Sequence, residues 1–429
     1  IMLLIYRHLI NILFPIIIII ISLRVWFKKE DKNRFKEKLF ISSFNIIRNR
    51  DKKLIWFHVA SIGELKSIIP LIKKLNTNNK FEFLITSVTI SSSKLIVQQL
   101  SNEKNIIHRF FPIDKHSIII KFLESWSPDL ILFVDSEIWP NFLLEIKKRK
   151  IPLILLNGRI TKKTFLRWRL IPKVAKKIFQ TFDLCLASSN KSKNYLEQLN
   201  AKNVKHIGNL KLSAEIKSKN QLDQNKDTLK NLRFWCAIST HQGEDLLCLK
   251  THLNIKKTHS NIVTIIIPRH IDRSHNIKLA CNKFDLKAQI LSKNELIKPD
   301  SEIVIINSYG VISDYLEFCK SVFIGKSMLK KLKHVGGQDP IEAAKFGCKI
   351  YHGPFVSNFE EIYQLLNELK ISKTIYNETE LSDCLIEDLN NFSKTYDKNI
   401  STINSLGEKI LEDTYNELNL SLKNENAKT

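Results

Sequence analysis

The sequence has few glycines, and it lacks the glycine-rich loops that hold nucleotides in two common enzyme classes. It contains 11 glycines in 429 residues, and no strand-like run leads into Gly-x-Gly-x-x-Gly or into a Walker A loop. Dinucleotide-dependent dehydrogenases and P-loop enzymes need these loops because their backbone must approach the phosphates closely. Neither class is therefore predicted.

Cysteine is also scarce. The seven cysteines never form Cys-x-x-Cys and never join histidines at the spacing of metal ligands. This pattern argues against a zinc module and against a disulfide framework. An odd number of scattered thiols is typical of a protein kept in a reducing compartment.

Acidic residues are outnumbered by basic ones. Lysine and arginine total 67 against 43 aspartates and glutamates, so the formal charge is +24. Such a charge predicts a polyanionic partner, and nucleic acid, an anionic membrane or a phosphorylated substrate would each fit. The cations are spread along the chain without a known nucleic-acid-binding module. A membrane-tethered nucleic-acid-binding protein is therefore an alternative, and the other two partners are favoured.

One long apolar run stands near the beginning of the sequence. Residues 9–23 carry no charge, residues 16–21 are all isoleucine, and four cations follow: Arg24, Lys28, Lys29 and Lys32. The run is close to the shortest that spans a bilayer, and Pro15 interrupts it. No small-x-small cleavage site follows, so a membrane anchor at 1–28, spanning or half-inserted, is favoured over a signal peptide or a buried helix. The cationic flank predicts that the next domain stays on the cytoplasmic side.

Strand-like and helix-like segments alternate through the rest of the chain. Short apolar runs indicate buried strands, and amphipathic stretches between them indicate helices on both faces of parallel sheets. The polar segment 214–232 separates two such series. We therefore predict an α/β protein with two Rossmann-like doubly wound domains, at 29–213 and 233–429.

A carboxylate follows the first apolar run after the anchor. The segment 55–64 consists of a strand-like run, a turn of small residues and then Glu64, where a helical pattern begins. Open α/β sheets build their clefts at the carboxyl ends of strands, and the dipole of the following helix favours an ionised carboxylate. Glu64 is therefore a candidate general base. The competing interpretation is an ordinary residue of a helix start.

Two more polar turns follow strands of the first domain. Asp135 and Glu137 come after the run 130–134, and Asn157-Gly158-Arg159 follows the next run. Ser136 is expected to cap the following helix, with Pro140 near its first position. Capping does not explain the two carboxylates. Together with Glu64, these turns predict a cleft along one edge of the sheet.

The first domain ends with Gly208-Asn209-Leu210-Lys211. This short turn presents Lys211 at the domain junction. In so basic a chain, a solvated lysine is the ordinary alternative to a functional one.

Similar turns follow the strands of the second domain. Ser239 or Thr240 is expected to cap a helix, where free backbone N–H groups suit a phosphate. Another strand ends in Pro268-Arg269-His270. A guanidinium at the sheet edge suits a phosphate or a carboxylate.

The segment 323–344 combines glycine turns with polar side chains. Glycines let the backbone approach a ligand closely. Asp339 is expected to cap a helix that starts at Pro340, with Glu342 in its first turn, where a carboxylate can accept hydrogen bonds from ribose hydroxyls. A capping box would explain Asp339 and Glu342 without a ligand. It would not explain the glycines and Lys326 beside them.

Eight short motifs lie in order along the two domains: SIGE (61–64), SEIWPN (136–141), NGR (157–159), GNLK (208–211), STHQGE (239–244), PRH (268–270), GGQDPIEAA (336–344) and HGPFVSNF (352–359). As a set they resemble the 3-deoxy-D-manno-octulosonic acid (Kdo) transferases of lipopolysaccharide assembly. The resemblance extends over residues 30–365 and includes the N-terminal anchor. It implies a GT-B fold, in which two Rossmann-like domains face each other across a cleft. It also implies inverting transfer of Kdo from CMP-Kdo to a lipid A precursor, lipid IVA.

The resemblance further implies roles for individual residues. Glu64 matches the general base, and Glu137 and Lys211 match positions that stabilise the transition state. Nine residues match positions that hold the CMP part of the donor: Pro268, Arg269, Tyr309, Gly310, Val311, Asp339, Pro340, Ile341 and Glu342. The sequence has no convincing Asp-x-Asp pair at a strand end, so we expect neither a required metal nor another cofactor.

The sequence departs from the family pattern around the donor. Gly325-Lys326-Ser327 stands where the family usually has GGS, and GGQDPIEAA stands for GGHNPLEP. Gly310-Val311 replaces a frequent Gly-Glu pair. These differences lie around the positions that match the nucleotide and the leaving group.

The anchor and the cationic composition fit an acceptor that is a phosphorylated lipid in an anionic membrane. The expected partners are CMP-Kdo, a lipid A precursor and the cell inner membrane, with the catalytic domains on the cytoplasmic side and no nucleic acid. The alternative function within the same fold is another glycolipid glycosyltransferase, such as a lipid-A-disaccharide synthase, or an epimerase-like protein.

Overall fold

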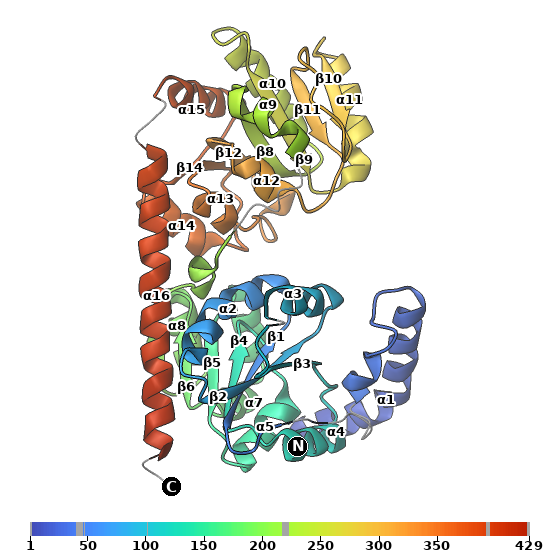
Figure 1. The fold of residues 1–429 in the computed structure, drawn as a ribbon, viewed down its shortest axis with the longest axis vertical. Helices are drawn as coiled ribbons and strands as arrows, with labels where there is room; N and C mark the ends of the chain where they lie inside the picture. The colour runs from blue at the N-terminus through green and yellow to red at the C-terminus, as the bar shows by residue number, and fades with distance from the viewer. Residues whose placement is uncertain are drawn as a thin grey trace. The chain divides into compact units, whose positions relative to one another are not determined.

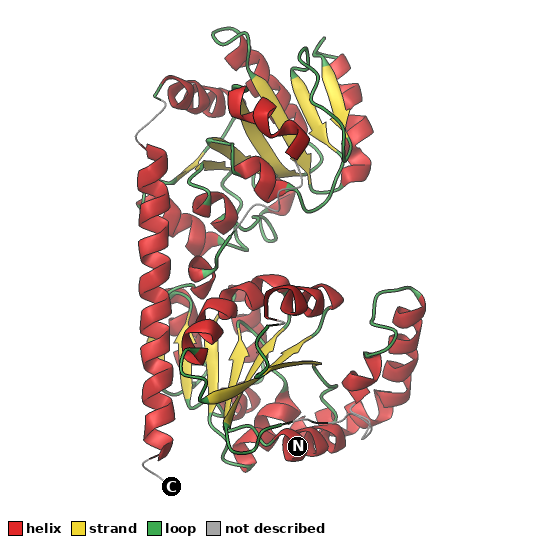
Figure 2. Cartoon of the chain, viewed as in Figure 1, coloured by secondary structure: helices red, strands yellow, loops and turns green. Residues whose placement is uncertain are grey.

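The computed structural model describes residues 2–39, 46, 48–100, 102–216, 223–391 and 395–426. The chain forms two compact units. Unit 1 comprises residues 1–214 and 407–429, and unit 2 comprises residues 215–406. Each unit contains a parallel sheet with helices packed on it (Figures 1 and 2). The predicted pair of doubly wound α/β domains is confirmed.

The sheet of unit 1 has seven parallel strands in the order β3-β2-β1-β4-β5-β6-β7. The strands are β1 (Lys53–Val59), β2 (Phe81–Ser87), β3 (Ile106–Phe110), β4 (Leu130–Val134), β5 (Leu153–Gly158), β6 (Leu184–Ala187) and β7 (Val204–His206). The helices are α1 (Met2–Trp26), α2 (Ile62–Asn76), α3 (Ile90–Leu100), α4 (His116–Trp126), α5 (Pro140–Lys148), α6 (Lys162–Arg169), α7 (Pro172–Phe179) and α8 (Asn190–Gln198). The strand order reverses between β1 and β4, which is where ligands bind in open α/β sheets.

The sheet of unit 2 also has seven parallel strands, in the order β10-β11-β9-β8-β12-β13-β14. They are β8 (Phe234–Thr240), β9 (Val263–Pro268), β10 (Ala288–Leu291), β11 (Ile303–Ile306), β12 (Ser321–Ile324), β13 (Lys349–His352) and β14 (Ser372–Thr374). The helices are α9 (Lys226–Asn231), α10 (Glu244–Lys256), α11 (Ser274–Asn282), α12 (Ile312–Leu316), α13 (Ile341–Lys345), α14 (Glu360–Glu368) and α15 (Glu378–Asn390). Here the order reverses between β8 and β12.

Burial on both faces explains the unbroken apolar strands. All five residues of β4 and all seven of β8 are buried, as expected for strands covered by helices on both sides. Strands β10 and β14 were not predicted. Both are short edge strands with polar residues, so neither produces an apolar run.

The structure corrects two predicted domain boundaries. Part of the segment assigned to the linker belongs to unit 2, because α9 buries Leu229 and Asn225 hydrogen-bonds to residues 295 and 297. The chain end was assigned to the second domain, yet residues 407–429 belong to unit 1. The helix concerned is α16 (Thr395–Asn426).

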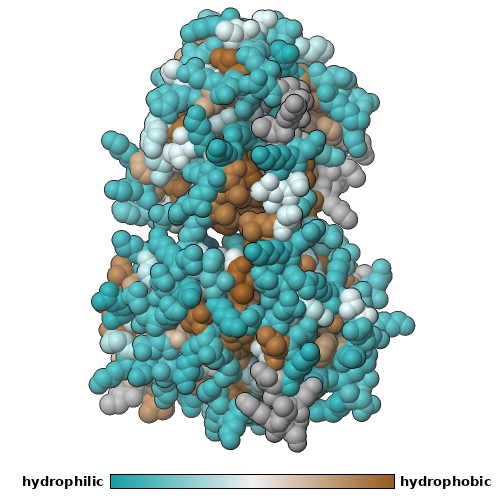
Figure 3. Space-filling view, turned by 90° about the vertical axis from the view of Figure 1, so that its left-hand side faces the viewer, coloured by the Kyte–Doolittle hydropathy of each residue, from teal (hydrophilic) through white to brown (hydrophobic). Residues whose placement is uncertain are grey.

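Helix α16 packs closely on unit 1 at a glycine. A side chain at Gly407 would lie 2.2 Å from the carbonyl oxygen of Leu212, so only glycine permits this approach. Further along, Lys205 Nζ lies 2.8 Å from Glu417 Oε1, and Leu418 is fully buried. The face shown in Figure 3 is mostly hydrophilic, with apolar patches among the polar side chains.

Helix α1 is long and apolar enough to cross a membrane, and it is the one such helix among the described residues. Its side chains from Met2 to Trp26 are mostly exposed, and they include Ile12, Ile16 and Ile19. The predicted apolar helix is confirmed, and the alternative of a buried core helix is excluded for this structure.

Candidate functional site

Glu64 lies at the reversal point of the unit 1 sheet, in the first turn of α2. Ser61 caps this helix, because its Oγ accepts a hydrogen bond from the backbone N–H of Glu64 at 3.2 Å. The carboxylate in turn accepts from Ala60 N at 2.7 Å and from Ser61 Oγ at 3.0 Å. The helix-start interpretation is therefore correct as far as it goes, but each carboxylate oxygen retains a lone pair for a further donor.

The surroundings of Glu64 change its acidity. Burial raises its pKa to about 7, the nearby carboxylates Asp135 and Glu137 raise it too, and the hydrogen bonds from Ala60 and Ser61 oppose the shift. Any effect of the helix dipole in favour of the ionised form is outweighed by burial, which leaves Glu64 8% exposed. A pKa near neutrality suits a general base better than an ordinary glutamate pKa does.

The carboxylate of Glu137 interacts with two aromatic side chains, His58 on β1 and Trp139. Its Oε2 accepts a hydrogen bond from Trp139 Nε1 at 2.8 Å and lies 3.2 Å from His58 Nε2. His58 is fully buried, stacks on Phe111 at 3.6 Å between ring centroids, and has its Nδ1 3.0 Å from Thr86 Oγ1. Burial alone would raise the pKa of Glu137, but the hydrogen bonds with His58 and Trp139 outweigh burial and lower it.

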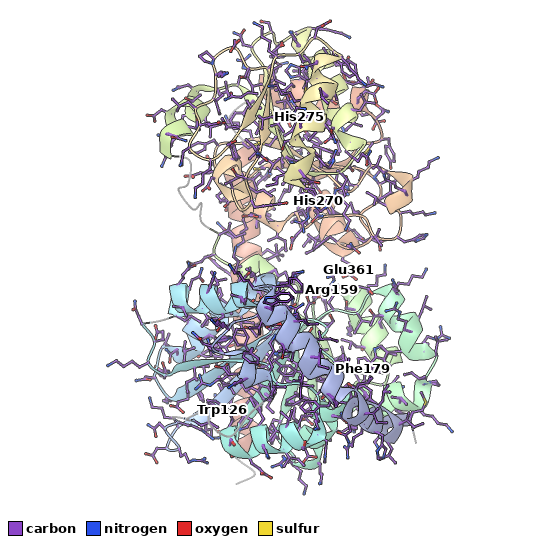
Figure 4. The ribbon with its side chains drawn as sticks, turned by 90° about the vertical axis from the view of Figure 1, so that its right-hand side faces the viewer. Trp126, Arg159, Phe179, His270, His275 and Glu361 are labelled. Carbon is purple, nitrogen blue, oxygen red and sulfur yellow. The ribbon has the colours of Figure 1, made fainter. Side chains whose placement is uncertain are left out.

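Asp135 and Asn157 end neighbouring strands in a strained backbone conformation. Their φ angles are 63° and 54°, in the left-handed region that aspartate and asparagine tolerate better than most residues. Asn157 Oδ1 accepts a hydrogen bond from Leu210 N at 2.8 Å, which fixes the turn before Lys211. Arg159, labelled in Figure 4, follows β5, and its N–H donates to Asp135 O at 3.1 Å.

Lys211, at the end of the first domain, extends its side chain toward Asp135 and the start of α2. Its Nζ lies 3.8 Å from Asp135 Oδ2, and a side chain added at Gly63 would meet Nζ at 3.9 Å. The lysine is thus beside the start of α2 and is not simply solvated, since its side chain is 17% exposed. The structure therefore brings Glu64 and Glu137 to one edge of the unit 1 sheet, as the sequence predicted, and places Lys211 at the same edge.

In unit 2 the reversal point is organised by Glu244, a buried carboxylate for which the sequence suggested no separate role. Glu244 Oε2 accepts hydrogen bonds from His241 N at 2.9 Å and Lys326 N at 2.7 Å. Its Oε1 accepts from Ser327 N at 2.8 Å and Met328 N at 3.0 Å. One carboxylate therefore joins the turn after β8 to the turn after β12.

Three glycines let the turns of unit 2 pack backbone on backbone. A side chain at Gly325 would lie 2.6 Å from Ser239 O, one at Gly336 would lie 2.1 Å from Phe355 O, and one at Gly353 would lie 2.2 Å from Ser327 O. Lys326 has a φ of 59° at a position where the family pattern has glycine. Lys326 therefore adopts a left-handed backbone conformation that strains a residue with a side chain.

The residues predicted to hold CMP lie on three turns after strands of unit 2. Arg269 is exposed directly after β9, and Tyr309 is 67% exposed after β11. Val311 and Ile341 are buried at 5% and 4% exposure, so their side chains stabilise the turns and only their backbone is available to a ligand. Gly310 adopts a φ of 79°.

The third of these turns precedes α13. Asp339 Oδ1 accepts a hydrogen bond from Ile341 N, the first residue of the helix, at 3.0 Å, but the N-cap position is occupied by Pro340. Glu342 lies in the first turn. Asp339 thus binds a helix-start N–H from the position before the N-cap, and the prediction that it caps a helix starting at Pro340 is wrong by one residue.

Two other capping predictions are wrong. The N-cap of α10 is Gly243, and Thr240 Oγ1 donates instead to Asp245 at 2.9 Å. Ser136 does not cap α5, although Pro140 is its first residue as predicted. The α5 N–H groups are instead bound by Asp114, which lies far away in the sequence.

No group of three or more histidine, cysteine or acidic side chains is placed to hold a metal ion within the described parts of the chain. The seven cysteines are buried and unpaired with one another. The charged side chains described at the two sheet edges include carboxylates, the lysines Lys211 and Lys326 and the arginines Arg159 and Arg269, and backbone N–H groups lie beside them.

Comparison with known proteins decides the family. Residues 33–214 match the family model described as 3-deoxy-D-manno-octulosonic-acid transferase (kdotransferase). The 3-deoxy-D-manno-octulosonic acid transferase of Rickettsia bellii is 30% identical over 415 residues, which cover 95% of this chain and 97% of the relative. The chain belongs to the Kdo transferase family. The relative from Haemophilus influenzae is 26% identical and covers 74% of each chain.

Members of the Kdo transferase family are glycosyltransferases, so the chain is an enzyme of this class. Solved structures support the GT-B fold. The UDP-GlcNAc 2-epimerase of Neisseria meningitidis aligns with a TM-score of 0.56 at 14% identity, covering 84% of this chain and 98% of that one. A glycosyltransferase from Rickettsia africae aligns with a TM-score of 0.53 at 13% identity, covering 87% and 98%. At these identities the similarity shows the fold alone.

Proposed function

We propose that this Kdo transferase moves Kdo from CMP-Kdo to a lipid A precursor with inversion at the anomeric carbon. The observation that supports this most directly is Glu64, a buried carboxylate with a pKa near 7 at the reversal point of the unit 1 sheet. Family membership supports the donor and the class of acceptor. Lipid IVA is the acceptor that fits the cationic chain and its apolar helix best.

In the proposed reaction, Glu64 accepts the proton of the acceptor hydroxyl as the oxygen attacks the anomeric carbon. The bond between that carbon and the CMP phosphate oxygen breaks, and CMP leaves with the electron pair. Lys211 stands beside Asp135 at the same edge and supplies positive charge to the transition state. Glu137 is kept ionised by His58 and Trp139, and it can stabilise positive charge developing on the sugar.

The donor nucleotide is assigned to the strand ends of unit 2. Arg269 offers a guanidinium to the phosphate. The turns at 309–311 and 339–342 offer backbone groups and the carboxylate of Glu342 to the nucleoside. Charge neutralisation of the phosphate by Arg269 would make a metal unnecessary, so no cofactor is proposed.

We place the enzyme at the cell inner membrane with both units on the cytoplasmic side. The exposed apolar surface of α1 supports a membrane location, and the cations that follow it support the orientation. An anionic membrane would also attract a chain of charge +24.

The proposed function is tested by incubating the purified enzyme with CMP-Kdo and the tetraacylated lipid A precursor, with and without EDTA, and measuring the product mass. We expect the lipid to gain Kdo in both arms. UDP-sugar in place of CMP-Kdo provides the control. Turnover of a UDP-sugar but not of CMP-Kdo would contradict the proposal, and loss of transfer in EDTA would contradict its metal-free form.

The acidity of Glu64 predicts a pH profile. Its pKa is raised to about 7, and only the deprotonated form can accept a proton, so kcat/KM should rise with pH to a plateau and reach half its maximum near pH 7. The profile is measured from pH 5 to pH 9 with CMP-Kdo as the varied substrate. An Asp135→Asn variant removes one charge that raises this pKa, so its midpoint should move to lower pH. A profile that is flat across this range would contradict the role of Glu64.

Arg269 should matter for the donor alone. Replacing the exposed guanidinium by Arg269→Ala removes a hydrogen bond to a charged group, and we expect CMP to bind about tenfold more weakly or worse, since such bonds contribute about 1.5–3 kcal/mol. Calorimetric titration of CMP measures this. The exposed Lys283→Ala in the same unit is the matched control and should leave the affinity unchanged. Equal CMP affinities for Arg269→Ala and the wild type would remove Arg269 from the donor site.

A further inference from the structure

Helix α1 makes a specific contact with the body of unit 1. The hydroxyl of Tyr6 donates a hydrogen bond to Asp114 Oδ2 at 2.8 Å. Asp114 lies between β3 and α4 and is 3% exposed. Close by, Lys115 Nζ lies 3.6 Å from the ring centroid of Phe14, and Leu3 packs against the hydrophobic core. The N-terminal half of α1 is therefore docked on unit 1.

The same aspartate holds the start of α5. Asp114 accepts hydrogen bonds from Asn141 N at 3.1 Å and Phe142 N at 2.9 Å, and its backbone carbonyl accepts from Asn141 Nδ2 at 2.7 Å. Helix α5 has no side-chain cap at its own N-cap residue, Trp139. Asp114 performs that function from another part of the chain.

The start of α5 is also the end of the turn that carries Glu137. Trp139 directly precedes the helix and donates a hydrogen bond to Glu137. Its ring lies 5.5 Å from that of Phe111, which stacks on His58, the other partner of Glu137. A shift of the α5 start would therefore move Trp139 and with it the carboxylate of Glu137.

The hydrogen bond between Tyr6 and Asp114 depends on whether α1 crosses the membrane or stays beside unit 1. The helix rises about 1.5 Å per residue, so residues 6 and 26 are about 30 Å apart along it. That distance equals the hydrocarbon thickness of a bilayer, and a helix that crossed it would carry Tyr6 to the side opposite unit 1. The hydrogen bond from Tyr6 to Asp114 therefore requires the N-terminal part of α1 to stay beside unit 1.

We propose that α1 is a positioning element of the active site as well as an anchor. Tyr6 completes the hydrogen bonds of Asp114, and Asp114 fixes the start of α5 and the turn that presents Glu137. Only the docked helix provides this hydroxyl, so docking of α1 and competence of the site are linked. The proposal rests on the proposed role of Glu137 in transfer.

The test uses the full-length enzyme in vesicles and the variant Tyr6→Phe, which removes one hydroxyl and keeps the ring. We expect the amides of Asn141 and Phe142 to exchange with deuterium several-fold faster, because the carboxylate that accepts their hydrogen bonds loses the hydroxyl that helps to hold it. The kcat for transfer should fall several-fold, while the acceptor KM and sedimentation with vesicles stay unchanged. Ser22→Ala is the matched control, since Ser22 Oγ bonds only within α1, to Ile18 O, and it should change none of these values.

The outcomes separate the possible failures. Unchanged exchange at residues 141 and 142 would overturn the link between α1 and α5. Faster exchange with an unchanged kcat would overturn the claim that the start of α5 positions Glu137 for transfer. Absence of Kdo transfer by the wild-type enzyme would instead overturn the proposed function, and the exchange measurement would still decide whether Tyr6 positions α5. Asp114→Asn provides a second variant, for which the same changes should be larger.

Discussion

A Glu64→Gln variant is expected to lose about 10²- to 10⁴-fold in the rate of Kdo transfer, the usual contribution of a general base. Glutamine has the same size and can still accept a hydrogen bond from Ala60 N through its oxygen. It cannot take a proton from the acceptor hydroxyl. Single-turnover transfer at saturating substrates measures the loss, and calorimetry should show that CMP binds as it does to the wild type.

Two controls keep this result interpretable. Glu124→Gln, on the exposed surface of the same unit, should retain full activity. Thermal unfolding should show Glu64→Gln folded, because Ser61 still caps α2 through Glu64 N. A rate within a few-fold of the wild type would show that another group takes the proton.

Glu64 could be found from the sequence because its signal is local. A strand-like run, a turn of small residues and a helical pattern place the side chain at a strand end without knowledge of any other part of the chain. The same logic located Glu137 and Arg269. That the two glutamates meet depends on β1 lying next to β4, a pairing that no local pattern specifies.

The residues that support the site could not be found in this way. His58 stands in an unbroken apolar strand and resembles a buried core residue, and its partner Glu137 is 79 positions away. Glu244 looks like an ordinary first-turn glutamate until β12 is placed beside β8. Asp114 caps a helix that begins 26 residues later in the sequence. Each role arises from a long-range contact.

Helix α16 is another case in which the sequence does not reveal a long-range contact. Helix α16 buries apolar residues such as Ile403 and Leu418, but an apolar helix face in a sequence does not identify the surface on which it packs. Gly407 is the residue that allows contact with Leu212. A helix glycine is usually a destabilising residue, so its significance emerges only once the backbone opposite is known.

Glu244→Gln should produce the second large effect, on stability and on donor binding together. The carboxylate accepts four backbone N–H groups, two on each oxygen. An amide would turn its NH₂ toward two of these donors, and two hydrogen bonds to a charged group would be lost. At about 1.5–3 kcal/mol each, the free energy of unfolding should fall by about 3–6 kcal/mol for the transition that involves unit 2.

The same change should weaken CMP binding at least tenfold where the variant remains folded, because Glu244 holds the turn at 326–328 and Lys326 O accepts a hydrogen bond from Gly337 N, next to the proposed donor turn at 339–342. Urea unfolding followed by circular dichroism measures the first effect, and calorimetric titration of CMP at low temperature measures the second. Asp383→Asn removes an exposed carboxylate of α15 in the same unit and should change neither value. If Glu244→Gln unfolds at the wild-type urea concentration, the four hydrogen bonds do not stabilise the reversal point. Glu244 would then be no more than a helix-start residue, as its sequence context alone suggests.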